Sequence, residues 1–132
     1  FHGFISYKSI VQVLRQSKFL LLPYSNKISV NSGDLEVSKF ISPLKLFQYL
    51  AAKKVIIASN LKAYKHILKN KHNCILNSPN NIEEWKNSIK NLKKINSKKL
   101  SKNSFITAKQ YTWNNRVKKI INIFNERKFN AY

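Results

Sequence analysis

The sequence is short of several residue types, and each shortage narrows what the protein can be. It holds five acidic residues against 25 basic ones, two glycines, one cysteine and no methionine. The single cysteine, Cys74, excludes an internal disulfide, which favours a reducing compartment. Cys74 lies in the apolar segment "NCILN", so we expect a buried, inert thiol. No apolar run approaches the ~20 residues that a membrane-spanning helix needs.

The missing methionine also bears on how the chain is organised. The first residue, Phe1, reads as the inside of an apolar segment, and we therefore expect a fragment of a larger protein. A chain of 132 residues is long enough for one domain with a single core. We interpret residues 1–132 as one partial domain.

The formal net charge of +20 has three possible causes. Lysine, asparagine and isoleucine, which AT-rich codons encode, contribute 22, 17 and 15 residues, whereas arginine contributes three. Surfaces that bind phosphate usually recruit arginine for its bidentate fork, so this composition favours codon bias. An anionic membrane surface is the second interpretation, and nucleic acid is the least favoured.

Apolar periodicity alternates between helical and strand patterns along the chain. We expect helices at residues 7–17, 43–52 and 61–68, and short buried strands at 19–23, 55–59 and 74–76, after a strand end before Gly3. Asn80 or Asn81, with Glu83 or Glu84 three residues later, predicts another helix start. Two more helices are expected at 98–110 and 113–125. On the last, Trp113, Val117, Ile120, Ile121 and Phe124 form one stripe, which we expect to face the core.

Strands that alternate with helices predict an α/β domain with a parallel sheet. In such sheets ligands bind beyond the carboxyl ends of the strands, where three segments converge: the loop at Gly3, the loop that begins at Tyr24, and the helix start at Ser42-Pro43. Ser42 suits the N-cap and Pro43 the first helical position. The free N–H groups of Leu44 and Lys45 would then favour an anion, with the Lys45 side chain nearby. The alternative is a well-capped helix that binds nothing.

Other kinds of site find little support. Neither glycine belongs to a dinucleotide-binding or P-loop pattern. The three histidines, His2, His66 and His72, lack the spacing of metal ligands, so we expect no metal site among them. Asp34 and Glu36 lie in the long polar segment and could reach a site, but the sequence assigns no catalytic residue.

Several motifs match a known pattern in order. Residues 42–68, "SPLKLFQYLAAKKVIIASNLKAYKHIL", are similar to "SPLKLFEYMAAGKPIIASDLPALREVL", and residues 1–25 and 111–124 ("YTWNNRVKKIINIF") match the flanking motifs. These segments resemble the C-terminal domain of family-4-like, GT-B-type glycosyltransferases (glycosyl transferases group 1). The resemblance implies a Rossmann-like sheet with flanking helices that ends in two or three helices. The start of this domain and an N-terminal acceptor domain would be missing, so we expect the fragment to be inactive alone.

The resemblance also implies roles for single residues. Ser42, Pro43 and Leu44 would face the donor diphosphate or sugar, and Lys45 falls on the lysine of the pattern. Gln48 stands where the family has a glutamate that hydrogen-bonds the donor ribose. A glutamine still accepts and donates hydrogen bonds, without the charge. Phe40 replaces a second glutamate. Lys53 and Val55 replace the usual Gly and Pro, and Lys53 would adopt a left-handed conformation at a cost of ~1 kcal/mol.

The leading hypothesis is a hexosyltransferase domain that binds a nucleotide-sugar donor and transfers the glycosyl group, with retention, to a glycan or lipid-linked acceptor. The resemblance implies no metal and no cofactor besides the donor. A catalytically degenerate relative that acts as a binding module is the alternative, which Gln48 motivates, and a basic nucleic-acid-binding domain ranks third. We expect a cytoplasmic location, with peripheral contact at the anionic inner membrane as an option.

Overall fold

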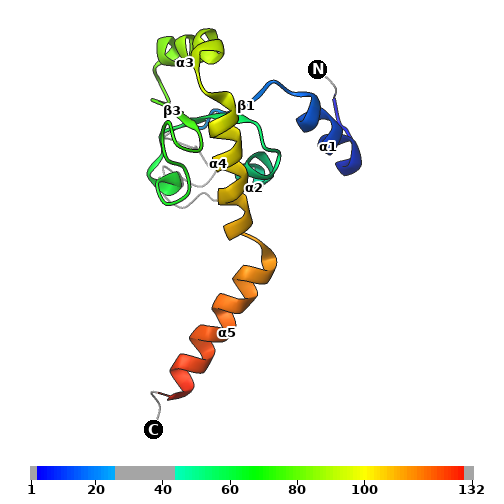
Figure 1. Cartoon of the computed structure of the whole chain (residues 1–132), viewed down its shortest axis with the longest axis vertical. Helices are drawn as coiled ribbons and strands as arrows, with labels where there is room; N and C mark the ends of the chain where they lie inside the picture. Colours follow the sequence, from blue (N-terminus) through cyan, green and yellow to red (C-terminus); the bar gives the residue numbers. More distant parts are fainter. Residues whose placement is uncertain (1–2, 26–43, 130–132) are drawn as a thin grey trace, which may run out of the picture.

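The computed structural model describes residues 3–25 and 44–129, with side chains up to residue 126. In chain order the elements are α1 (Tyr7–Gln16), β1 (Phe19–Leu22), α2 (Leu44–Ala51), β2 (Val55–Ser59), the 3-10 helix η2 (Lys62–Tyr64), β3 (Ile75–Asn77), α3 (Ile82–Lys90), the 3-10 helix η3 (Asn91–Lys94), α4 (Ser97–Gln110) and α5 (Trp113–Phe129) (Figure 1). The expected helices and strands are therefore largely present, and their bounds agree within one or two residues, apart from the segment around η2 and the longer α5.

The described strands form a three-stranded parallel sheet in the order β1-β2-β3. Leu20 pairs with Ile56 and Leu22 with Ala58, while Ala58 also pairs with Leu76 on the other side. All five residues of the central strand β2 are buried, as expected for a strand covered on both faces. An α/β fold with a parallel sheet and flanking helices is thus confirmed.

The core lies between the sheet and helices α2 and α4. Leu46 and Leu50 of α2 are fully buried and belong to one cluster with Leu22, Ile56 and Ala58 from the strands. Helix α4 packs against both α2 and β2. The buried Ser104 hydroxyl of α4 donates to the Leu50 carbonyl oxygen at 3.3 Å. These contacts fix α2 on the sheet, which matters because α2 carries three of the predicted site residues, Leu44, Lys45 and Gln48.

The segment between β2 and β3 differs from the predicted helix at 61–68. It forms one turn of 3-10 helix, η2, followed by turns. The buried side chain of Asn73 explains why: its Oδ1 accepts from the Lys69 amide at 2.8 Å, and its Nδ2 donates to the Ile67 carbonyl oxygen and to Thr107 Oγ1. Asn73 therefore replaces the hydrogen bonds that a continuing helix would have made, and ties the loop to α4.

The start of α3 is as predicted. Asn81 is its N-cap: the Asn81 Oδ1 accepts from the Glu84 amide at 3.2 Å, and the Asn81 Nδ2 donates to Glu84 Oε1 at 3.1 Å. Glu84 also accepts from the Ser78 amide at 2.6 Å. The neighbouring Glu83 pairs with Lys86 at 2.7 Å. Glu83 and Glu84, two of the five acidic residues, are therefore both engaged near this helix start.

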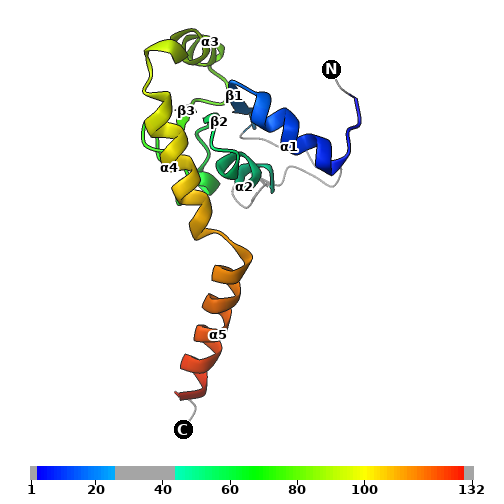
Figure 2. The same ribbon diagram turned by 45° about the vertical axis from the view of Figure 1, so that its right-hand side comes forward.

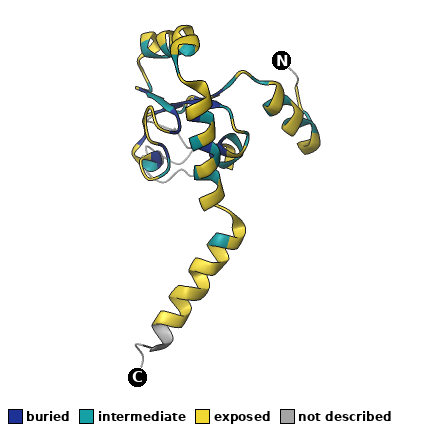
Figure 3. Ribbon diagram, in the orientation of Figure 1, coloured by how far each residue is buried: buried dark blue, intermediate teal, exposed yellow. Residues whose placement is uncertain are grey.

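Helix α5 contradicts the expectation that its apolar stripe faces the core. Trp113, Val117, Ile120, Ile121 and Phe124 are all exposed, and the helix extends away from the rest of the molecule (Figures 1 and 3). Helical periodicity shows which side of a helix is apolar, but it does not show what covers that side. Within the described ranges, none of the helices combines the length and apolar character that crossing a bilayer requires.

Candidate nucleotide-sugar site

The predicted site residues lie in several places in the structure. Gly3 is exposed just before α1, with a φ of 60°, and a Cβ there would meet nothing within 4 Å. Leu44 and Lys45 form the exposed first turn of α2, and Gln48 lies one turn further on. Ser42 and Pro43, like Phe40, Asp34 and Glu36, lie outside the described residues. The structure thus places Leu44, Lys45 and Gln48 on one helix.

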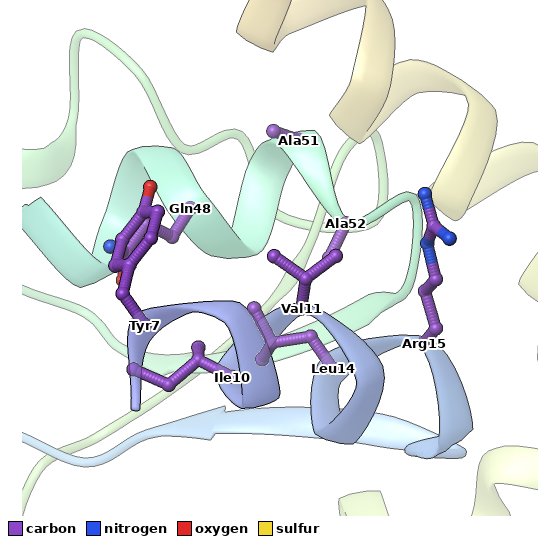
Figure 4. Close-up of a pocket in the computed structure, with 8 residues that line it drawn as sticks. All are labelled: Tyr7, Ile10, Val11, Leu14, Arg15, Gln48, Ala51 and Ala52. Atoms are coloured by element: carbon purple, nitrogen blue, oxygen red, sulfur yellow. The ribbon is translucent and has the colours of Figure 1, made fainter. Parts of the chain in front are cut away.

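Helices α1 and α2 lie side by side and run in the same direction (Figures 2 and 4). Each precedes a strand of the parallel sheet, so each begins at the edge where the strands end. Tyr7 of α1 and Gln48 of α2 lie at the same end of the groove between the helices, and Arg15 lies at the opposite end (Figure 4). The Tyr7–Gln48 end is therefore the one that faces the carboxyl edge of the sheet.

The groove between α1 and α2 contains a cavity of about 280 Å³. Its walls are mainly apolar, and its lining residues are Tyr7, Ile10, Val11, Leu14, Arg15, Gln48, Ala51 and Ala52. Gln48 is partly buried, and its side-chain amide makes no hydrogen bond to the residues that the structure describes. A polar amide on an apolar wall with its bonding capacity unused can bind a hydroxyl-bearing ligand. Tyr7 was not predicted as part of this site, because nothing in the sequence pairs it with Gln48.

The first turn of α2 adds donors for an anion. Leu44 and Lys45 are exposed, and the N–H groups of a first helical turn have no partner within the helix. Lys45 contributes a cation in the same turn. Leu44, however, lines a second cavity of about 300 Å³ on the other side of α2, beside α4 and α5. Leu44 and Gln48 lie one turn apart on the same face of this helix, and each borders a different cavity.

Tyr24 has mainly a packing role. Its backbone N–H donates to Ser59 Oγ at 2.8 Å, which ties the segment after β1 to the end of β2. Its ring meets the buried Tyr64 ring edge-on, with the centroids 6.5 Å apart. Burial, and next the neighbouring Tyr24, raise the pKa of Tyr64 to about 12, so its hydroxyl stays protonated. Sequence reasoning missed the contact between Ser59 and Tyr24, and the position of Ser59 at the end of a buried strand was the signal available.

Cys74 is fully buried, as predicted. Burial raises the pKa of its thiol to about 12, with a smaller opposing effect from the Lys69 backbone, and the thiol S–H donates to the Lys69 carbonyl oxygen at 3.6 Å. The thiolate is therefore scarce at neutral pH, which rules out a role as nucleophile. Across residues 3–25 and 44–126, no three histidine, cysteine or carboxylate side chains gather as a metal site would require.

Lys53 adopts the left-handed conformation that its position implied. Its φ is 55°, directly after α2 and where a glycine would carry no steric cost. The Lys53 ammonium lies 6.0 Å from the centroid of the Phe105 ring, a contact that compensates for part of the backbone strain. The turn that leads from α2 into β2 is thus preserved without a glycine.

Comparisons with known proteins identify no relative. A scan against protein-family models gives no match, and a search among curated proteins gives none either. The functional interpretation consequently depends on the geometry of the site and on the sequence motifs.

Proposed function

We propose that this chain is the donor-binding part of a GT-B-type glycosyltransferase, in which the carboxyl edge of a Rossmann-like sheet holds a nucleotide sugar. The observation that carries the proposal is the position of Gln48. Its partly buried side-chain amide has no hydrogen-bond partner among residues 3–25 and 44–126, and it lies on the wall of the α1–α2 cavity, toward the end where both helices begin. The motif resemblance independently assigns this position to the donor ribose.

In the proposed complex each part of the nucleotide sugar has a chemical counterpart. The Gln48 carbonyl oxygen accepts a hydrogen bond from one ribose hydroxyl, and its NH₂ group donates to the other. The diphosphate lies at the first turn of α2, where the free N–H groups, the helix dipole and Lys45 favour negative charge. These groups supply positive charge without a metal ion. Transfer to a glycan or lipid-linked acceptor, with retention, would require an acceptor domain, as the motif resemblance implies.

Calorimetric titration of the chain with UDP-glucose, GDP-mannose and ADP-glucose tests the proposal. We expect one of these donors to bind, and Gln48→Ala to weaken its binding about tenfold, because two hydrogen bonds of about 0.5–1.5 kcal/mol are lost. Gln12→Ala is the matched control, since Gln12 is an exposed α1 residue outside the cavity. No binding of any donor, or equal losses in the two variants, would refute the site.

Replacing Gln48 by Glu separates an enzyme from a degenerate binding module. A carboxylate accepts stronger hydrogen bonds from the ribose, so Gln48→Glu should bind the donor at least as tightly as the parent chain. If a longer form of the protein transfers sugar and its Gln48→Ala variant does not, the degenerate alternative fails. Binding of RNA or DNA that falls steeply with salt and ignores Gln48 would instead favour the nucleic-acid interpretation.

A further inference from the structure

Helix α5 presents an apolar stripe to solvent along most of its length. The stripe consists of Trp113, Val117, Ile120, Ile121 and Phe124, whose exposed fractions range from 45% to 76%. At about 100° per residue, these five positions fall within roughly 100° of arc, so they form one face. Figure 3 shows almost the whole helix in the colour of exposed residues. An apolar face of this extent on a soluble surface marks an interaction site.

Charge narrows the choice of partner. Arg116 and Lys118 flank the apolar face, Lys119 lies on the opposite, polar face, and α5 contains one acidic residue, Glu126. With a formal net charge of +20, a second copy of the chain would be repelled, whereas an anionic surface would be attracted. Trp and Phe on the apolar side, with Lys and Arg beside them, are the composition of a helix that lies in the membrane interface.

The base of α5 adds a place for an anionic headgroup. A cavity of about 300 Å³ lies where α2 meets the α4–α5 junction, and its lining includes Leu44, Phe47, Tyr111, Trp113, Arg116 and Lys119. The Phe47 and Tyr111 rings lie 5.5 Å apart, and the Arg116 guanidinium lies 5.6 Å from the centroid of the Trp113 ring. Aromatic walls with two cations suit a lipid whose phosphate meets the cations and whose glycerol contacts the rings.

We propose that α5 is an interfacial helix that holds the protein on a bilayer containing anionic phospholipid. The stripe from Trp113 to Phe124 enters the boundary between headgroups and acyl chains, and Arg116 and Lys119 bind lipid phosphate at the base of the helix. This inference does not depend on the proposed nucleotide-sugar site, which is a different cavity with no lining residue in common.

Co-sedimentation with vesicles tests the apolar half of the proposal. Vesicles of phosphatidylglycerol and phosphatidylcholine should bind the chain, and pure phosphatidylcholine vesicles should not. Replacing Ile120 and Phe124 together by Ser should weaken binding at least about tenfold, because two inserted side chains are lost. The matched control replaces Ile82 and Ile106 by Ser, since both are exposed but lie on α3 and α4. Circular dichroism checks that both variants keep their helices.

A pair of charge reversals tests the electrostatic half. Changing Lys118 and Lys119 to Glu should weaken binding at least about thirtyfold, since each basic residue near an anionic surface contributes roughly 1 kcal/mol. Changing Lys93 and Lys94 to Glu alters the net charge equally but acts on η3, and should have a much smaller effect.

Three results would overturn the proposal. The first is a chain that stays in the supernatant with anionic vesicles. The second is equal weakening by the η3 and α5 charge reversals, which would indicate diffuse adsorption. The third is a dimer in sedimentation velocity that the Ile120 and Phe124 substitutions dissociate, which would assign the stripe to a second copy of the chain.

Discussion

Helices α2 and α5 carry similar apolar stripes in the sequence but have opposite environments in the structure. Leu46 and Leu50 of α2 are 0% exposed, whereas every described apolar side chain of α5 is exposed. The difference comes from the elements around them. Helix α2 connects two neighbouring parallel strands and is covered by α4, while α5 begins after the turn at Tyr111 and contacts little of the sheet. Whether an apolar stripe is buried therefore depends on which elements the topology places beside it.

Helix α1 lies between these extremes. It has a clear N-cap, in which Ser6 Oγ accepts from the Ser9 amide at 3.3 Å, yet none of its residues is fully buried. Its partly buried face, which includes Ile10 and Leu14, borders the cavity that Gln48 shares. A helix that packs incompletely leaves a groove beside it, and here that groove is the candidate site.

The largest expected effect comes from shortening a buried side chain of α2. Leu46→Ala should lower the free energy of unfolding by about 3 kcal/mol, because Leu46 is 0% exposed and its removal leaves a cavity. Leu44→Ala in the same helix and Ile120→Ala in α5 should each change it by less than about 1 kcal/mol, since these side chains are 79% and 45% exposed. Urea denaturation measures all three, and a large loss from Ile120→Ala would show that α5 packs on the body.

The free energy of unfolding should also depend on pH in the alkaline range, because Cys74 and Tyr64 are buried. The Cys74 thiol is protonated in both states below pH 9, but the unfolded chain loses that proton above 9 while the folded chain keeps it until about pH 12. Stability should therefore fall by up to about 1.4 kcal/mol per pH unit across this window. Cys74→Ala should remove this slope between pH 9 and 10, and Tyr64→Phe should reduce the part above 10. Identical slopes in Cys74→Ala and the parent chain would contradict a buried thiol.

The smallest expected effect comes from Lys53, in the turn that follows α2. Lys53→Gly should raise the free energy of unfolding by about 0.5 kcal/mol, because relief of the left-handed strain outweighs both the added flexibility of glycine and the lost contact with Phe105. Lys54→Gly is the control and should be destabilising, since Lys54 does not have a positive φ. Thermal unfolding of the two variants should shift in opposite directions, and a shift in the same direction would show that φ at Lys53 is not the determining factor.

Sequence reasoning predicted most of the fold because the determinants were local. Continuous apolar runs marked β1 and β2, and the Asn81–Glu84 pair marked the start of α3. It failed between β2 and β3, where Asn73 takes over the backbone hydrogen bonds through contacts that include Thr107, far along the chain. It also failed for α5, because burial depends on neighbours that periodicity does not specify.

The candidate site was predictable to a smaller extent. The motif identified Gln48 and the first turn of α2, and the structure places Gln48 beside a cavity. Tyr7 could not be paired with Gln48 from the sequence, because their proximity results from the parallel packing of α1 and α2. Leu44 and Gln48 share a face of α2 but border different cavities, and this likewise could be known only from the positions of α1, α4 and α5.

The most direct test of the proposed function is nuclear magnetic resonance of the isotopically labelled chain, titrated with the donor that binds in calorimetry. Signals of the Gln48 side-chain amide, the Lys45 backbone amide and Tyr7 should shift together in proportion to occupancy, and the Trp113 indole signal should stay in place. Shifts confined to Trp113 and the α4–α5 cavity, or none at any saturating donor concentration, would contradict a nucleotide-sugar site at the α1–α2 groove.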